Sequence, residues 1–228
     1  MRAVILQPSY LPWRGYFDLI HRADVFVFYD DVQYDKNGWR NRNRIKTPRG
    51  TKWLTIPVPQ RGVVSGKVAI NAVAPIGTAW TAEHFEALRR SYAGAPHFDE
   101  ALLRRLYAAP PMLLAEFTIA ATIALAAQLG IRNTRFLRSS ELAAAGTKTS
   151  RLIAILGEIG ATHYLSGPSA RGYIEPEKFA DAGITLEWMT YDYPEYPQLY
   201  PPFDPFVTVL DLMFMTGPDA PRYIWGAR

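Results

Sequence analysis

The chain of 228 residues contains no cysteine, and this absence excludes several kinds of protein chemistry. Without thiols, the protein cannot form disulfides, use a cysteine nucleophile or build a cysteine-bearing zinc site. Histidine is also scarce, and the spacing of its four copies is not that of metal ligands. The four histidines are His21, His84, His97 and His163. We therefore expect no metal site.

Long apolar runs are missing as well. The amino-terminal segment has one charge and a short apolar run before Gln7 and Pro8, which fits neither a signal peptide nor a membrane anchor. The richest later stretch, residues 110–130, is interrupted by Glu116 and Gln128. We expect a protein without a membrane span, located in the cytoplasm.

Acidic residues are absent from one strongly basic stretch, residues 36–52. The net charge of the chain is only +4, so this basic charge is concentrated. The stretch contains Lys36, Arg40, Arg42, Arg44, Lys46, Arg49 and Lys52. It could hold a phosphate-bearing ligand, or it could be a solvated edge whose charges only prevent aggregation.

The residues that are present indicate a globular α/β protein, since 49% are hydrophobic and 20% are charged. Apolar runs at residues 3–7 and 25–29 predict strands, and the helical spacing at residues 13–23 predicts a helix between them. Two strands joined in this way pair in parallel, and ligands bind at their carboxyl ends. These ends are residues 7–12 and 30–34.

The remaining pattern predicts a single domain spanning residues 1–228. A hairpin or extended ribbon is expected at residues 39–58, followed by a helical insertion or cap at about 78–129. Strands and helices then alternate again, so the parallel sheet is expected to continue. A wrap rich in tyrosine and proline precedes a last helix at residues 207–215. The expected fold is a three-layer α/β domain.

The first candidate site segment is Gln7 to Phe17. A strand end followed by a turn and a helix start presents free amides and a positive dipole end to an anion. Its candidate residues are Gln7, Ser9, Tyr10 and Trp13. The alternative is a tightly packed turn with Tyr10 and Trp13 in the core.

The second candidate segment is Asp30 to Lys46, where carboxylates adjoin cations and amides. Successive strand residues point in opposite directions, so at most one of Asp30 and Asp31 faces a given site. With Ser9, the candidate catalytic residues here are Asp30, Asp31 and Lys36. The candidate binding residues are Tyr34, Trp39, Arg40, Asn41, Arg42 and Lys46. A charged surface hairpin is the alternative.

Two later segments could also bind a ligand. Lys148, Ser150 and Arg151 occupy the expected first turn of a helix, where cations oppose the dipole unless an anion is bound. Gly167 and Tyr173 belong to a small-residue loop after a strand. That loop has neither the dinucleotide fingerprint nor the P-loop pattern, and a simple turn is an equal alternative.

Four ordered blocks of this sequence resemble the WbqC-like family of bacterial proteins. They read QPSYLPWRGYFDLI, FVFYDDVQYDKNGWRNRNRIK, KTSRLIAILGEIGATHYLSGPSARGYI and YPQLYPPFDPFVTVLDLMF. Members of that family belong to O-antigen and related polysaccharide gene clusters, and the resemblance implies transfer of an aminoacyl group, such as glycine, onto an amino sugar.

The opening strand, helix and strand are also similar to the HUP-like nucleotide-binding fold of class I synthetases and nucleotidyltransferases. Those enzymes carry HxGH in the first turn of the helix, whereas this chain has Pro12-Trp13-Arg14-Gly15-Tyr16. ATP, if it is bound, is therefore not held by that motif.

These observations lead us to expect an aminoacyl-type transferase acting on an amino-sugar nucleotide or a similar amine. Arg40, Arg42 and Lys46 would hold the pyrophosphate. Asp30 or Asp31 would accept a proton, and Ser9, Gln7 and helix amides would stabilise the oxyanion. The acyl donor stays open between aminoacyl-tRNA and amino acid plus ATP.

Two other functions remain possible from the sequence. One is a nucleotidyltransferase or adenylate-forming ligase, and the other is a noncatalytic protein that binds a nucleotide sugar or RNA. The sequence predicts no oligomeric state.

Overall fold

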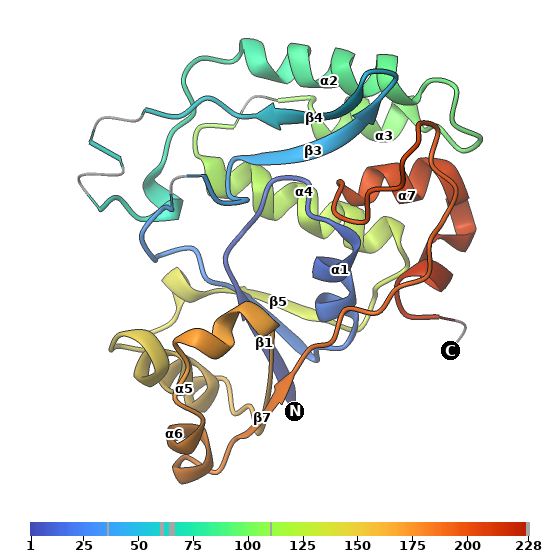
Figure 1. Cartoon of the computed structure of the whole chain (residues 1–228). Helices are drawn as coiled ribbons and strands as arrows, with labels where there is room; N and C mark the ends of the chain where they lie inside the picture. Colours follow the sequence, from blue (N-terminus) through green and yellow to red (C-terminus); the bar gives the residue numbers. More distant parts are fainter. Residues whose placement is uncertain (36, 60–61, 64–66, 110, 227–228) are drawn as a thin grey trace.

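The protein is built around a parallel sheet of five strands in the order β5-β2-β1-β6-β7 (Figure 1). The computed structural model describes residues 1–35, 37–59, 62–63, 67–109 and 111–226. The strands of this sheet are β1 (Arg2–Leu6), β2 (Val25–Phe28), β5 (Arg135–Arg138), β6 (His163–Ser166) and β7 (Thr185–Trp188). The α/β prediction with a parallel sheet is confirmed.

The first three elements have the predicted parallel crossover. Helix α1 (Arg14–His21) joins β1 to β2, and these strands pair in parallel from Ala3↔Val25 to Leu6↔Phe28. The β2 strand is buried at every position, as its unbroken apolar run VFVF predicts. The carboxyl ends of β1 and β2 therefore lie beside each other.

Helices cover both faces of the sheet, because alternate strand residues point to opposite sides. Ala3 and Ile5 pack into one apolar cluster with α5 (Lys148–Glu158) and α6 (Pro176–Asp181). Val4, between them in the chain, packs into the other cluster with α1 and α4 (Leu114–Gln128). The result is three layers.

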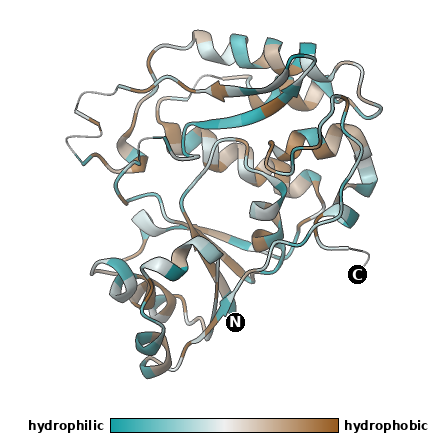
Figure 2. Cartoon of the chain, viewed as in Figure 1, coloured by the Kyte–Doolittle hydropathy of each residue, from teal (hydrophilic) through white to brown (hydrophobic). Residues whose placement is uncertain are grey.

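A separate two-stranded sheet follows the first unit. Strands β3 (Arg42–Thr47) and β4 (Gly50–Thr55) pair antiparallel, and Gly50 has a φ of +98°, which suits glycine at this tight turn. The predicted hairpin is therefore confirmed. Figure 2 shows that β3 is mostly hydrophilic, unlike the central strands.

Helices fill the interval between β4 and β5. Helix α2 (Ala79–Tyr92) lies beside the hairpin, and α3 (Glu100–Leu106) precedes α4 (Figure 1). Their grouping into an insertion or cap of a single domain stays a prediction. None of the helices in the described ranges combines the length and apolar character needed to cross a membrane.

The carboxyl-terminal part returns along the molecule to α1. After β7 an extended segment leads to α7 (Val209–Thr216), as Figure 1 shows. Thr208 forms an antiparallel bridge with Trp13. This wrap brings tyrosines of the tail beside the first helix. Short 3-10 turns complete the elements: η1 (Ile70–Ala72), η2 (Ser139–Glu141), η3 (Pro168–Gly172) and η4 (Gly217–Tyr223).

Tyr10 belongs to a buried polar network in the core. Its hydroxyl contacts His84 Nδ1 at 2.8 Å and also bonds with the Tyr107 hydroxyl. All three side chains are nearly inaccessible to solvent. The expectation that Tyr10 binds substrate is therefore corrected, because its hydroxyl is occupied inside the core.

His84 is expected to make the protein less stable in acid. Burial lowers its pKa from 6.5 to about 4, so the folded state resists protonating it. The unfolded chain protonates this imidazole near pH 6.5, whereas the folded protein does so only near pH 4. The free energy of unfolding should therefore be at its full value above pH 6.5 and fall by about 3 kcal/mol as the pH drops to 4. Urea unfolding from pH 7 to 4 should show this loss in the wild type and not in His84→Gln. Parallel pH curves for the two proteins would refute the expectation.

Candidate functional site

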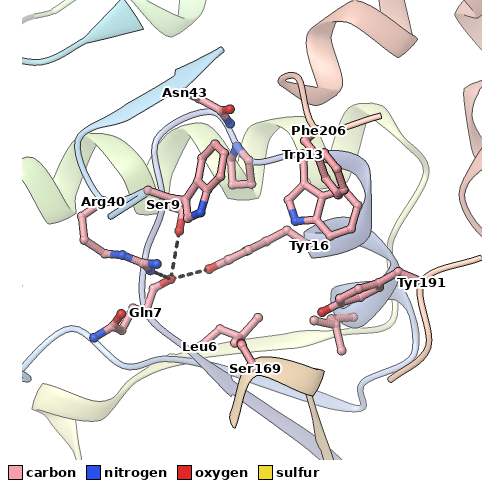
Figure 3. Close-up of a pocket in the computed structure, with 13 residues that line it drawn as sticks. Leu6, Gln7, Ser9, Trp13, Tyr16, Arg40, Asn43, Ser169, Tyr191 and Phe206 are labelled. Atoms are coloured by element: carbon pink, nitrogen blue, oxygen red, sulfur yellow. Dashed lines mark hydrogen bonds between the residues drawn. The ribbon is translucent and has the colours of Figure 1, made fainter. Parts of the chain in front are cut away.

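A cavity of about 330 Å³ lies where the loops after β1 and β6 diverge (Figure 3). The connections of these neighbouring strands run to opposite faces of the sheet, which is where open α/β sheets bind ligands. The cavity is lined by Leu6, Gln7, Ser9, Pro12, Trp13, Tyr16, Leu19, Trp39, Arg40, Asn43, Ser169, Tyr191 and Phe206.

Three side chains converge on the backbone carbonyl of Gln7 (Figure 3). Arg40 donates to it at 2.9 Å, the Tyr16 hydroxyl at 3.1 Å and the Ser9 hydroxyl at 3.4 Å. Arg40 also donates to the Pro8 carbonyl at 3.3 Å. The turn after β1 is thus fixed by polar contacts at one end of the cavity.

Arg40 is the charged group at this end. Its guanidinium lies 3.3 Å from the Asp35 carboxylate, and burial lowers its pKa. A guanidinium remains protonated at physiological pH even so. The site therefore has a permanent, partly desolvated positive charge held between Asp35 and the first turn.

Aromatic rings form the other end of the cavity. The Trp13 ring meets Tyr191 edge-on at 4.9 Å between centroids and Phe206 at 5.6 Å. Burial raises the pKa of Tyr191 to about 12, so its hydroxyl stays protonated. Tyr191 and Phe206 come from the carboxyl-terminal wrap. The cavity is thus completed by a segment far away in the sequence.

The indole of Trp13 covers the start of α1. A β-carbon placed on Gly15 would lie 2.4 Å from the Trp13 ring, so only glycine permits this contact. The indole therefore lies against the first turn of α1. The expected role of the helix amides as an oxyanion site stays a prediction.

Gly15→Ala should displace the Trp13 ring and alter the cavity. We expect a stability loss of about 1–3 kcal/mol, typical of overpacking, together with a change in tryptophan fluorescence. Gly157 in α5 is the matched control, since a β-carbon there meets nothing within 4 Å. Gly157→Ala should stabilise by about 0.5–1 kcal/mol. An unchanged fluorescence spectrum and stability in Gly15→Ala would contradict the expected displacement.

Asp30 and Asp31 follow the carboxyl end of β2 and lie beside η2. Asp30 is fully buried and accepts hydrogen bonds from the Ser140 amide at 3.0 Å and the Ser140 hydroxyl at 2.8 Å. Asp31 pairs with Arg151 and accepts from Ser139 at 2.6 Å. Asp30 is therefore a structural acceptor, and its expected catalytic role is corrected.

Lys46 is also placed differently from our expectation. Its side chain is buried, and its ammonium donates to the Pro202 carbonyl near Asp211. Asn41 is buried and donates to the Ile56 carbonyl at 2.8 Å, which fixes the hairpin. Neither residue lines the cavity, so their expected contacts with substrate are corrected.

Five of the predicted site residues do meet at the cavity: Gln7, Ser9, Trp13, Trp39 and Arg40. The other predicted residues lie around or away from it. Tyr34 is buried, and Arg42 lies on the hairpin over the Trp53 ring. A β-carbon on Gly167 would lie 3.1 Å from the Tyr191 hydroxyl. Lys36 lies outside the described residues.

The last three predicted residues flank the Asp31 side of the sheet edge. Lys148 and Ser150 are exposed in the first turn of α5, next to Arg151. Tyr173 is 60% exposed and near enough to Arg40 for the guanidinium to influence its pKa, which burial raises. None of these residues lines the cavity.

Several cavity residues were not predicted from the sequence. The polar and aromatic ones are Tyr16, Asn43, Ser169, Tyr191 and Phe206, and the others are Leu6, Pro12 and Leu19. Asn43 donates to the Tyr10 and Leu11 carbonyls and so ties the hairpin to the first turn. The aromatic density of the carboxyl-terminal wrap was the available signal for Tyr191 and Phe206.

Within the described ranges, no group of three or more histidine, aspartate or glutamate side chains is arranged to hold a metal ion. The donors at the cavity are instead amides, hydroxyls and one guanidinium, with aromatic surface opposite. Such a lining suits a polar ligand that contains a ring.

Comparison with known proteins gives the family. No solved structure matches the chain. A protein named "Uncharacterized protein Rv1507c", from Mycobacterium tuberculosis, is 40% identical over 230 residues, which cover 98% of this chain and 97% of the relative. The model of the WbqC-like protein family matches residues 7–223. Because both matches span nearly the whole chain, the protein belongs to the WbqC-like protein family.

Proposed function

We propose that this protein is a transferase that forms an amide on the amine of a small ring-bearing substrate, such as an amino-sugar nucleotide. The observation that carries the proposal is the cavity after β1, with aromatic walls at one end and Arg40 at the other. Its place at the divergence of β1 and β6 is where a doubly wound sheet binds nucleotides.

The two ends of the cavity suit the two parts of such a substrate. Trp13 and Tyr191 offer ring surface to a sugar or a base. Arg40 offers positive charge to a phosphate, and Gln7 and Ser9 offer hydrogen bonds. Arg42 on the adjoining hairpin could add a second phosphate contact, whereas Lys46 takes no part.

The reaction proposed is transfer of an acyl group from an activated ester to the amine. The amine nitrogen attacks the acyl carbon, a carbon–nitrogen bond forms, and the ester carbon–oxygen bond breaks. The proton lost by the amine leaves with the alcohol. Asp35 suits the proton acceptor because it lies 3.3 Å from the cavity residue Arg40.

Two features favour a preformed acyl donor over free amino acid and ATP. The strand order supports a likeness to the HUP-like nucleotide-binding fold, but the adenylating motif HxGH is absent from the first turn of α1. The Trp13 ring also packs against that turn, where a β-carbon on Gly15 would lie 2.4 Å from it. An adenylate-forming ligase or nucleotidyltransferase therefore remains the second candidate.

The experiment is an assay of the full chain with an amino-sugar nucleotide. Charged tRNA, and separately amino acid with ATP and Mg²⁺, would be supplied, and the amide would be detected by mass spectrometry. We expect product in the first mixture and its loss in Asp35→Asn. Pyrophosphate release without amide would support the second candidate. Binding without any turnover would leave a noncatalytic nucleotide-sugar binder.

A further inference from the structure

Two tryptophans are exposed side by side near the mouth of the cavity. Trp39 and Trp53 are 40% and 42% exposed, and their ring centroids lie 5.3 Å apart at 38°. The guanidinium of Arg42 lies 4.4 Å from the Trp53 centroid. Large aromatic side chains that stay exposed together mark binding surfaces. We call Trp39, Trp53, Arg42 and Arg44 the hairpin platform.

The hairpin platform is held in place by its own contacts. Arg44 lies 5.9 Å from the Trp39 centroid and 5.7 Å from the Trp53 centroid. Asp204 anchors Arg44 through an ion pair at 3.2 Å. Trp53 is also the cross-strand partner of Arg44 in the β3–β4 ladder. The rings are therefore presented by a regular sheet, with one carboxylate offsetting part of the positive charge.

A basic groove of about 810 Å³ continues from the hairpin platform toward α2. Trp53 belongs to both surfaces. The groove contains three cationic side chains, and none of its lining residues is acidic. Its lining is Thr47, Pro48, Arg49, Gly50, Thr51, Lys52, Trp53, Ala87, Arg90 and Ser91.

The groove, the hairpin platform and the cavity share residues, and we call this succession of surfaces the path. Trp53 joins the groove to the platform, and Trp39 joins the platform to the cavity, because it lines both. Cations that follow a track and aromatic rings that offer stacking faces are the two features by which proteins hold an unpaired nucleic-acid strand.

We propose that the groove and the hairpin platform bind a single-stranded RNA end, with bases against Trp39 and Trp53 and phosphates against Lys52, Arg49 and Arg90. The choice of RNA rests on the proposed function, because an aminoacyl-tRNA donor carries its acyl group as an ester of the terminal ribose hydroxyl at an unpaired RNA end. The path directs that end toward the cavity, where the amine substrate would lie.

The groove and the hairpin platform together should prefer RNA with unpaired bases. In a duplex the faces of the bases are stacked on one another and are closed to Trp53. A single strand leaves them open. The affinity should also fall with salt, because each phosphate contact releases counterions.

The test is fluorescence anisotropy of a labelled single-stranded RNA of about ten nucleotides with the full chain, without any amine substrate or acyl group. We expect tighter binding than to the duplex of the same sequence. Trp53→Ala should weaken it by roughly 5- to 150-fold. Lys52→Ala combined with Arg90→Ala should flatten the salt slope by about 1.4.

Matched controls lie away from the path. Arg132→Ala, at an exposed arginine before β5, should leave the salt slope unchanged, and Trp225→Ala should leave the affinity unchanged. Trp53→Phe keeps an aromatic stacking face and should recover most of the binding. Equal affinity for single strand and duplex, or a Trp53→Ala protein that binds like the wild type, would overturn the proposal.

The two proposals can fail separately. If amide forms from amino acid and ATP while no RNA binds at low salt, the docking proposal is wrong and the proposed function stands. If RNA binds as described but no donor yields amide, the surface stands as an RNA site. Its assignment as the donor site is then withdrawn.

Discussion

Asp211→Ala is expected to lower the free energy of unfolding by about 3–5 kcal/mol, the range for breaking a buried ionic network by removing one partner. Asp211 is fully buried. It accepts hydrogen bonds from Tyr196 at 2.8 Å, Tyr92 at 2.9 Å and Gln198 at 2.9 Å. Lys46 lies close enough to influence its pKa. Alanine would leave two buried hydroxyls and the Gln198 amide without this acceptor.

Urea unfolding at neutral pH would measure the loss. Asp219→Ala is the matched control, since Asp219 forms an exposed ion pair with Arg222 at 3.2 Å, and its removal should cost about 0–1 kcal/mol. Asp211→Asn keeps an oxygen acceptor and should lose less than alanine does. If Asp211→Ala were as stable as Asp219→Ala, the buried network around Asp211 would not contribute to the free energy of unfolding.

The same network explains why Lys46 was misplaced from the sequence. In the sequence it is one of seven cations in a stretch without acids, so a solvated or ligand-facing position was expected. Its partners, Pro202 and Asp211, lie more than 150 residues away in the chain. Charge patterning is local, whereas the pairing of a buried charge depends on the tertiary fold.

The opening strand, helix and strand were predictable because local signals and the global fold agree there. The apolar run of β2 and the helical spacing of α1 leave one simple way to bury both, a parallel crossover. The rule that ligands bind at carboxyl ends then located Gln7 and Ser9 at a cavity.

The directions and partners of individual side chains were harder to predict from the sequence. Asp30 and Asp31 were expected to point in different directions if the strand continued through them. Strand β2 ends at Phe28, however, and both carboxylates accept from the Ser139 hydroxyl. Asp30 also accepts from Ser140, and Asp31 pairs with Arg151. Tyr191 reaches the cavity through a wrap with no regular period. Such contacts depend on packing between distant segments, which a pattern of residue types does not encode.

Arg40→Ala is expected to weaken binding of an amino-sugar nucleotide by about 100-fold, corresponding to about 3 kcal/mol for charged hydrogen bonds lost at a partly buried site. The guanidinium joins the Gln7 and Pro8 carbonyls to Asp35, so its removal frees the first turn as well as the phosphate contact. Calorimetric titration with the amino-sugar nucleotide would measure the affinity.

Arg40→Lys separates charge from geometry. An ammonium keeps the positive charge but lacks the planar fork that spans two carbonyls, so affinity should recover only in part. Arg138→Ala is the matched control, because Arg138 is partly exposed, lies 4.0 Å from Glu141 and does not line the cavity. If Arg40 acts by holding the turn and the ligand, its loss should raise KM more than it lowers kcat. A variant with wild-type KM and affinity would remove Arg40 from the site, and with it the charge on which the proposed substrate depends.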